Sequence, residues 1–165
     1  LKMVNAEYPA PESAALIKVA NEKIKRLGLF EWVQMHTEYL ADDESLSLLS
    51  EANLIVFPYQ VTGESSSAAA RGGLTSERPV AVTPLPIFDD VAPAVFTLPG
   101  HTPEQIALGV GQLLDAIAND SEHVRTKRAE AERWCAGHRY SSLSQRLYRM
   151  LQGVARANQR INENG

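Results

Sequence analysis

The sequence predicts an α/β fold built on an open parallel β-sheet with helices on both faces. Short apolar segments rich in β-branched residues alternate with helical segments along residues 1–119, as in a chain of βαβ units. One complete unit is visible in residues 53–82, NLIVFPYQVTGESSSAAARGGLTSERPVAV, where two apolar strands enclose a run of small residues. With 165 residues, 44% of them hydrophobic, the chain can bury one ordinary core.

The first elements follow from hydrophobic periodicity and helix end signals. Residues 1–6 are predicted as a strand and residues 11–27 as a helix, which Gly28 ends as a C-cap. The apolar residues of this helix share one face: Ala15, Leu16, Val19, Ala20 and Ile24.

The next strand is predicted over residues 30–36, followed by a short helix to Glu51 that Asp42 or Asp43 can cap. The apolar run 54–59 is then a buried strand.

The remaining elements are a helix from Ser65 to Thr75, a strand over residues 79–83 and a last strand over residues 94–98. Thr102 is expected to cap a helix that runs to Asn119, with Gln105 in its first turn. Residues 121–161 are predicted to be helical, with a break within residues 136–141, where Gly137 and a serine pair lie.

A ligand is expected where the buried strand 54–59 ends, because ligands of open parallel sheets bind at the carboxyl ends of the strands. With a helix beginning at Ser65, free backbone N–H groups would point at the ligand, and small side chains would let it approach closely. This arrangement predicts a site for an anion such as a phosphate.

Three motifs of this block resemble the C-terminal, donor-binding domain of the group 1, retaining glycosyltransferases of GT-B architecture. SEANLIVFPYQ, GESSSAAARGGL and SERPVAV stand in the order of that family's ADLFVLPS, EGFGLVLLEAMA and GRPVVA. The spacing from Glu64 to Arg78 and Pro79 equals the family's spacing from its first motif glutamate to its Arg-Pro. Weaker similarities in LKMVNAEYP, LGLFEWVQMHTEYLADDESLSLLSEA and HRYSSLSQRLYRML extend the resemblance over nearly the whole chain.

The resemblance implies a Rossmann-like domain that binds a nucleotide-sugar donor. The enzyme would transfer the sugar, with retention, to a glycan or lipid-linked acceptor in surface polysaccharide synthesis. Glu64 corresponds to the first motif glutamate, so the resemblance implies a catalytic role beside the transferred sugar. The implied donor diphosphate and sugar-binding residues are Thr62, Gly63, Ser65, Ser66, Ser67 and Arg71, and the implied base-binding residues are Tyr39 and Leu40. No metal and no separate cofactor are expected, since the nucleotide sugar is itself the substrate.

The sequence departs from the family at the second motif glutamate, which in relatives binds the ribose hydroxyls. Gly72 stands at the aligned position, preceded by Arg71. Glycine has no side chain to bind a ribose, and whether its presence abolishes activity stays open. For Arg71, contact with a phosphate or a sugar carboxylate and a surface ion pair are both open.

The resemblance also sets the expected domain organisation. Residues 1–120 would form the nucleotide-sugar-binding domain and residues 121–165 a helical segment that closes it. Relatives carry a further strand and helix and an N-terminal acceptor-binding domain before this point. We therefore expect a part of a larger enzyme that is inactive by itself. In relatives the closing helix crosses back to that N-terminal domain.

Charge is distributed unevenly over the chain, whose net charge is −4. Residues 1–120 hold 7 Lys and Arg against 16 Asp and Glu, whereas residues 121–165 hold 9 against 4. A basic tail suits a nucleic acid or an anionic membrane surface. Because its basic residues are interleaved with apolar residues at helical spacing, a solvated helix face is favoured, and no nucleic-acid partner is expected.

The lone Cys135 cannot form an internal disulfide, which fits a reducing compartment. We therefore expect a cytoplasmic protein, with any membrane contact peripheral and at the inner face.

Two other functions stay open. The chain could be a non-catalytic relative kept for interaction, as the missing second glutamate suggests, or another nucleotide-sugar enzyme such as an epimerase. The four histidines have no metal-ligand spacing, no cysteine pair exists, and Ser65 is taken as a helix-start residue, not as a nucleophile.

Overall fold

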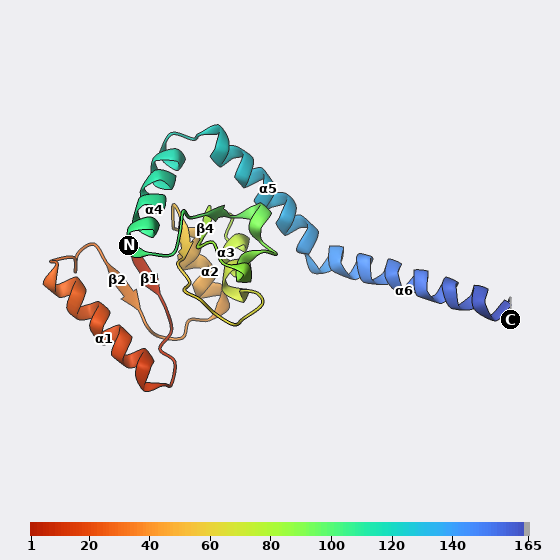
Figure 1. Ribbon diagram of the computed structural model, residues 1–165, viewed down its shortest axis with the longest axis horizontal. Helices are drawn as coiled ribbons and strands as arrows, with labels where there is room; N and C mark the ends of the chain where they lie inside the picture. The colour runs from red at the N-terminus through yellow and green to blue at the C-terminus, as the bar shows by residue number, and fades with distance from the viewer. Residues whose placement is uncertain (164–165) are drawn as a thin grey trace. The chain divides into compact units, whose positions relative to one another are not determined.

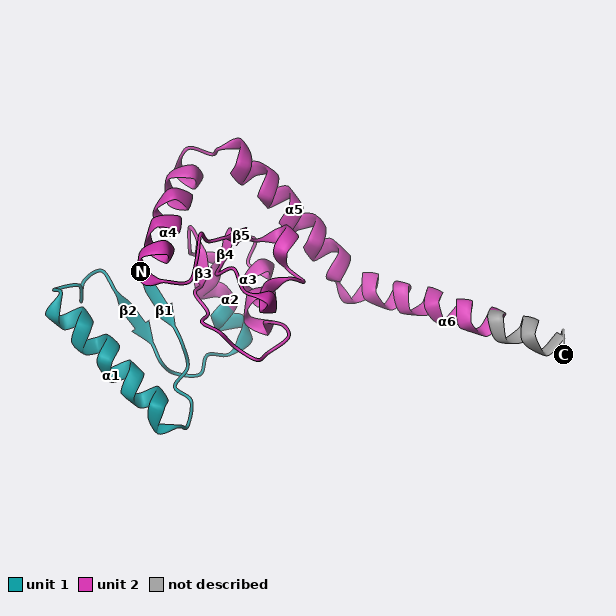
Figure 2. Cartoon of the chain, viewed as in Figure 1, with its two compact units in different colours: residues 1–45 teal, residues 46–165 magenta. Residues whose placement is uncertain are grey.

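The computed structural model describes residues 1–163, with side chains up to residue 156. Two compact units divide the chain, Leu1–Ser45 and Leu46–Gly165 (Figure 2). In both units parallel strands alternate with helices (Figure 1). The predicted α/β class with parallel, open sheets is therefore confirmed.

The first unit is one βαβ element. Strand β1 (Lys2–Val4) pairs in parallel with β2 (Gln34–His36), and helix α1 (Pro11–Arg26) connects them. The prediction that the second strand begins at residue 30 is wrong. The N–H groups of Trp32 and Val33 both donate to the carbonyl of Leu29, which holds this stretch in a turn.

Helix α2 (Asp42–Ser50) contains the boundary between the two units. Asp42 and Asp43 lie inside its first turn, so the prediction that one of them caps the helix is wrong. The preceding residue is Ala41, whose N–H donates to Glu44 Oε2 at 3.2 Å.

The second unit contains a three-stranded parallel sheet in the order β3-β4-β5, formed by β3 (Ile55–Phe57), β4 (Val80–Val82) and β5 (Phe96–Thr97). Helix α3 (Ala68–Thr75) connects the first two strands, and two 3₁₀ turns, η1 (Pro86–Phe88) and η2 (Ala92–Ala94), lie between the last two. The central strand is buried throughout, as expected for a strand covered on both faces.

Three further helices complete this unit: α4 (Pro103–Ala118), α5 (Glu122–His138) and α6 (Tyr140–Glu163). The predicted capping of α4 is confirmed, because Thr102 and Gln105 bond to each other's backbone N–H in a capping box. Helices α5 and α6 meet at Arg139, inside the predicted break.

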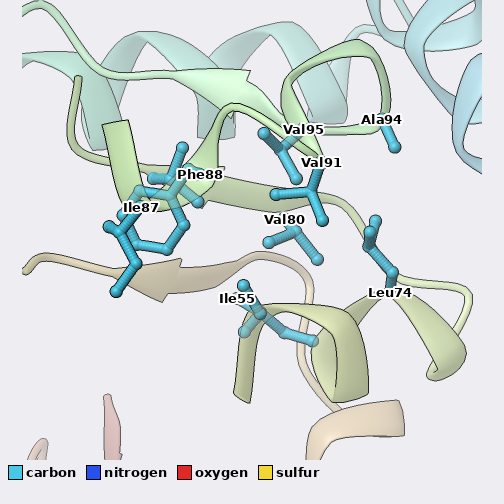
Figure 3. Packing of buried hydrophobic residues seen from close by; sticks show 10 residues of the cluster. Ile55, Leu74, Val80, Ile87, Phe88, Val91, Ala94 and Val95 are labelled. Atoms are coloured by element: carbon cyan, nitrogen blue, oxygen red, sulfur yellow. The ribbon is translucent and has the colours of Figure 1, made fainter. Parts of the chain in front are cut away.

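The buried core lies on both faces of the second sheet. Val80 belongs to a cluster that also contains Leu74 of α3 (Figure 3). Val82 belongs to the same cluster, and Trp134 of α5 packs against it. Ala81, which points to the opposite face, belongs to a second cluster packed by residues of α4. Helices therefore cover both faces of this sheet. Within the described residues, no helix has the length and apolar character needed to cross a membrane.

Candidate functional site

The candidate site is the loop that leaves the carboxyl end of β3 and leads into α3. Glu64 lies on this loop and is exposed, and its N–H donates to Thr62 Oγ1 at 3.3 Å. A side chain built at Gly63 would meet no atom within 4 Å, so the tip of the loop is open. Ser65 is exposed and Ser66 is half-buried. The loop thus presents a carboxylate and small side chains to solvent at the ligand-binding edge of a parallel sheet.

The predicted start of the helix at Ser65 is wrong, and with it the interpretation of Ser65 as a helix-start residue. Ser67 is the N-cap of α3, because its Oγ accepts the N–H of Ala70 at 3.1 Å. The N–H groups without an intrahelical partner are those of Ala68 and Ala69, while those of Ser65 and Ser66 belong to the loop. Serine is favoured at the N-cap because its side-chain oxygen can accept a backbone N–H, and alanine is favoured inside a helix. These preferences explain why the helix begins after Ser67.

Ser67 is buried, so its side chain is committed to the fold. Its Oγ also lies 3.2 Å from the hydroxyl of Tyr59, and the carbonyl of Tyr59 accepts a hydrogen bond of 2.8 Å from Thr83 Oγ1. The Tyr59 ring packs against Phe88 with centroids 5.1 Å apart. These contacts tie both ends of the loop to each other and to the end of β4.

A further contact crosses the same edge of the sheet. Gln60 Nε2, in the loop after β3, donates to the carbonyl of His101, which follows β5, at 3.1 Å. Hydrogen bonds therefore link the three segments that follow β3, β4 and β5, at the edge of the sheet where these strands have their carboxyl ends. Tyr59 and Gln60 are not predicted as site residues from the sequence, because no local signal marks partners this far apart in the chain.

Arg71 forms an ion pair with Asp90. Its Nε and Nη2 lie 2.8 and 2.7 Å from the same oxygen, Asp90 Oδ2, and its side chain is 48% exposed. The carbonyl of Asp90 accepts a hydrogen bond of 2.9 Å from Trp134 Nε1. Of the two roles left open for Arg71, the structure contains the ion pair, and its role toward a donor stays a prediction.

The two glycines of α3 have opposite surroundings. Gly72, at the position of the family's second glutamate, is exposed and has no atom within 4 Å of a built Cβ. A Cβ at Gly73 would lie 2.9 Å from Phe57 Cε2. Packing therefore requires glycine only at position 73.

Tyr39 and Leu40 follow β2 in the first compact unit. Tyr39 is 86% exposed and Leu40 is half-buried. Their role in binding a base stays a prediction.

A cavity of about 310 Å³ lies beside the carboxyl ends of β4 and β5. Its lining comes mainly from the proline-rich segment after β4 and consists of Val82, Thr83, Pro84, Leu85, Pro86, Phe88, Asp89, Ala92 and Thr97. The predicted site residues do not contribute to it, and its mostly apolar lining offers few groups to bind a diphosphate.

Two side chains of α5 have pKa values that differ from their ordinary values. Burial raises the pKa of the Cys135 thiol, which donates to the carbonyl of Leu74 at 3.5 Å, so this cysteine is a poor nucleophile. Hydrogen bonding to Lys127 lowers the pKa of the Glu130 carboxyl on the surface. No group of three His, Cys, Asp or Glu residues suited to a metal ion occurs in the described part of the chain.

No family model matches the sequence, and no curated protein matches it. Solved structures do. Sucrose-phosphate synthase (tll1590) from Thermosynechococcus elongatus matches 93% of this chain with a TM-score of 0.66 and 16% identity. Alr3699/HepE from Anabaena in complex with UDP matches 92% with a TM-score of 0.68 and 14% identity, and its complex with UDP-glucose does so with a TM-score of 0.61.

The chain spans 39–40% of the length of these structures. At 14–16% identity the similarity is one of fold, and it extends over less than half of each of these structures.

Proposed function

We propose that this chain is the donor-binding part of a retaining glycosyltransferase. The enzyme would move a sugar from a nucleotide sugar to a glycan or lipid-linked acceptor in surface polysaccharide synthesis. The observation that carries the proposal is the similarity in fold, over 92% of the chain, to a structure solved with UDP and with UDP-glucose. The exposed loop with Glu64 at the carboxyl end of β3 supports it.

The loop can supply what departure of a nucleoside diphosphate requires. Negative charge grows on the leaving phosphate, and positioned N–H dipoles stabilise it. In this chain those dipoles would be the N–H groups of residues 65–67 together with those of Ala68 and Ala69 at the start of α3. The exposed carboxylate of Glu64 would accept hydrogen bonds from the hydroxyls of the transferred sugar.

Calorimetric titration with UDP-glucose and with UDP tests the role of Glu64. Because the carboxylate would contact only the sugar, Glu64→Gln should weaken UDP-glucose binding by about tenfold, the scale of one hydrogen bond to a charged group, and leave UDP binding unchanged. Glu132→Gln, the same change on the exposed face of α5, is the matched control and should alter neither affinity. A loss that is equal for both ligands, or equal in the control, would contradict the assignment.

The ribose offers a second test, because Gly72 has no carboxylate. We expect UDP and its 2′,3′-dideoxy analogue to bind equally. The open space around position 72 lets a glutamate side chain be added without a clash, so Gly72→Glu should create a preference of about tenfold for the ribonucleotide, or about 1.4 kcal/mol. Gly72→Ala should create none. A preference in the unmodified chain would mean that another residue binds the ribose.

A non-catalytic role in interaction is the second candidate, and the specific observation that favours it is glycine at position 72. Failure of both nucleotides to bind would support this candidate over the transferase.

A further inference from the structure

The loop that carries Glu64 starts and finishes at two side chains that contact each other. Tyr59 follows β3, and Ser67 is the N-cap of α3, so residues 60–66 lie between them. The hydroxyl of Tyr59 and the Oγ of Ser67 are 3.2 Å apart and share a hydrogen bond. Ser67 is only 2% exposed, which limits the access of water to this bond. The two hydroxyls therefore close the loop at its base.

The backbone and the ring of Tyr59 are fixed by the structure beside it. Its carbonyl accepts a hydrogen bond of 2.8 Å from the Oγ1 of Thr83, a buried residue. Its ring packs against Phe88, a residue of the buried core (Figure 3), with centroids 5.1 Å apart. The ring also meets Phe57 edge-on, at a centroid distance of 6.2 Å. With the backbone and the ring both held, the hydroxyl of Tyr59 has a fixed position.

Between its two ends the loop has few contacts of its own. The side chain of Gln60 donates to the carbonyl of His101. The N–H of Glu64 donates to Thr62 Oγ1, which lies in the same loop. The described part of the chain shows no other hydrogen bond from residues 60–66. Because nearly all of these residues are also exposed, the place of the Glu64 carboxylate depends on how the ends of the loop are held.

We propose that Tyr59 is a positioning residue of the donor site: its hydroxyl fixes the loop and thereby holds the Glu64 carboxylate against the transferred sugar. The inference rests on the proposed function, in which Glu64 accepts hydrogen bonds from the sugar hydroxyls. Such bonds form over a narrow range of distance, about 2.5–3.2 Å, so a small movement of the loop loses them. In this role Tyr59 need not touch the donor.

Ser67 connects the base of the loop to the start of α3. The same Oγ that meets the Tyr59 hydroxyl accepts the N–H of Ala70 at 3.1 Å. The free N–H groups of this first turn are those that would bind the diphosphate. Ser67 can cap the helix whether or not residue 59 has a hydroxyl. Loss of the Tyr59 hydroxyl should therefore affect binding of the sugar more than binding of the diphosphate.

Tyr59→Phe isolates the hydroxyl, because a phenylalanine ring keeps the packing against Phe88. In calorimetric titration of the full 165-residue chain, this variant should bind UDP-glucose about fivefold more weakly, the scale of one hydrogen bond, and UDP within about twofold of the unmodified chain. A purely structural role predicts lower thermal stability with the ratio of the two affinities unchanged. Tyr148→Phe makes the same change on an exposed residue of α6 and should leave both affinities as they are.

A double variant tests whether Tyr59 acts through Glu64. Adding Tyr59→Phe to Glu64→Ala should weaken UDP-glucose binding no further, because the side chain that the loop positions is already gone. Losses that add would show that the hydroxyl acts on the donor by another route and would overturn the proposal.

Hydrogen exchange with saturating UDP-glucose gives a readout that does not depend on affinity. The ligand should slow exchange of residues 60–66 in the unmodified chain, and at least about threefold less in Tyr59→Phe. Equal slowing in both proteins would mean that the loop is held without the hydroxyl, against the proposal.

The outcomes separate this inference from the proposed function. If the unmodified chain binds neither UDP nor UDP-glucose, the proposed function fails and the positioning role fails with it. If Glu64→Gln weakens UDP-glucose binding selectively but Tyr59→Phe leaves both affinities unchanged, or lowers them equally, only the positioning role is overturned.

Discussion

At the scale of the residue, neighbouring glycines of one helix do different work. Gly73 lies against the ring of Phe57, so the end of β3 and the interior of α3 approach as closely as they do because position 73 has no side chain. Gly72 faces open space, so its only effect on the helix is the entropic destabilisation that a glycine causes there. In the sequence both glycines are equally unfavourable in a helix. Only their neighbours in the folded protein show that position 73 needs glycine and position 72 does not.

Alanine at each position should therefore have effects of opposite sign on the free energy of unfolding. Gly72→Ala should raise it by about 0.5–1 kcal/mol, because the backbone loses less entropy on folding. Gly73→Ala should lower it by about 1–3 kcal/mol, because the added Cβ overlaps the Phe57 ring. Urea denaturation of both variants measures the difference. Stabilisation in both would mean that the ring moves aside freely.

At the scale of the element, two helix ends use the same backbone conformation with different residues. Gly28 follows the C-cap of α1 with φ 66°, and Glu77 follows the C-cap of α3 with φ 61°. The N–H of Glu77 donates to the carbonyl of Leu74 at 3.3 Å. Left-handed backbone strains every residue with a Cβ, so glycine is the usual choice there.

Exchanging the residue types at these ends should change stability in opposite directions. Glu77→Gly should raise the free energy of unfolding by about 0.5–1 kcal/mol, the relief of strain being offset in part by the freer unfolded chain. Gly28→Ala should lower it by about 1 kcal/mol, since no atom lies within 4 Å of the new Cβ and the strain acts alone. Thermal unfolding of both variants tests this. A destabilised Glu77→Gly would show that the glutamate side chain contributes more than its backbone costs.

At the scale of the whole molecule, the buried core is concentrated in one of the two units. None of residues 1–45 is buried, whereas the second unit holds both clusters of buried apolar residues. Burial of apolar surface is the main stabilising contribution to a fold, so the two units have unequal stability.

Native-state hydrogen exchange should show this inequality directly. Amides of β1, β2 and α1 should be protected at least about tenfold less than those of β3 and β4, because local unfolding of the first unit exposes no fully buried side chain. Mass spectrometry of peptides from residues 1–45 and 54–83 measures both sets in one experiment. Equal protection would mean that the two units unfold together.

The sequence by itself determined the features that depend on neighbouring residues. The alternation of strands and helices, the capping of α4 by Thr102 and the break between α5 and α6 all arise from side chains within a few positions of each other. The same local chemistry held the true start of α3, since Ser67 and the alanines after it were visible. The predicted start at Ser65 is wrong because three consecutive serines all suit a cap, and the helix begins after the last of them.

Tertiary structure alone decided which distant residues meet around the candidate site. Tyr59 and Thr83 are 24 positions apart, Gln60 and His101 are 41 apart, and the contact of Trp134 with Asp90 spans 44. The difference between Gly72 and Gly73 likewise depends on where Phe57 lies. Periodicity and capping act along a few residues of chain, whereas these contacts exist only once the path of the backbone has brought separate strand ends together.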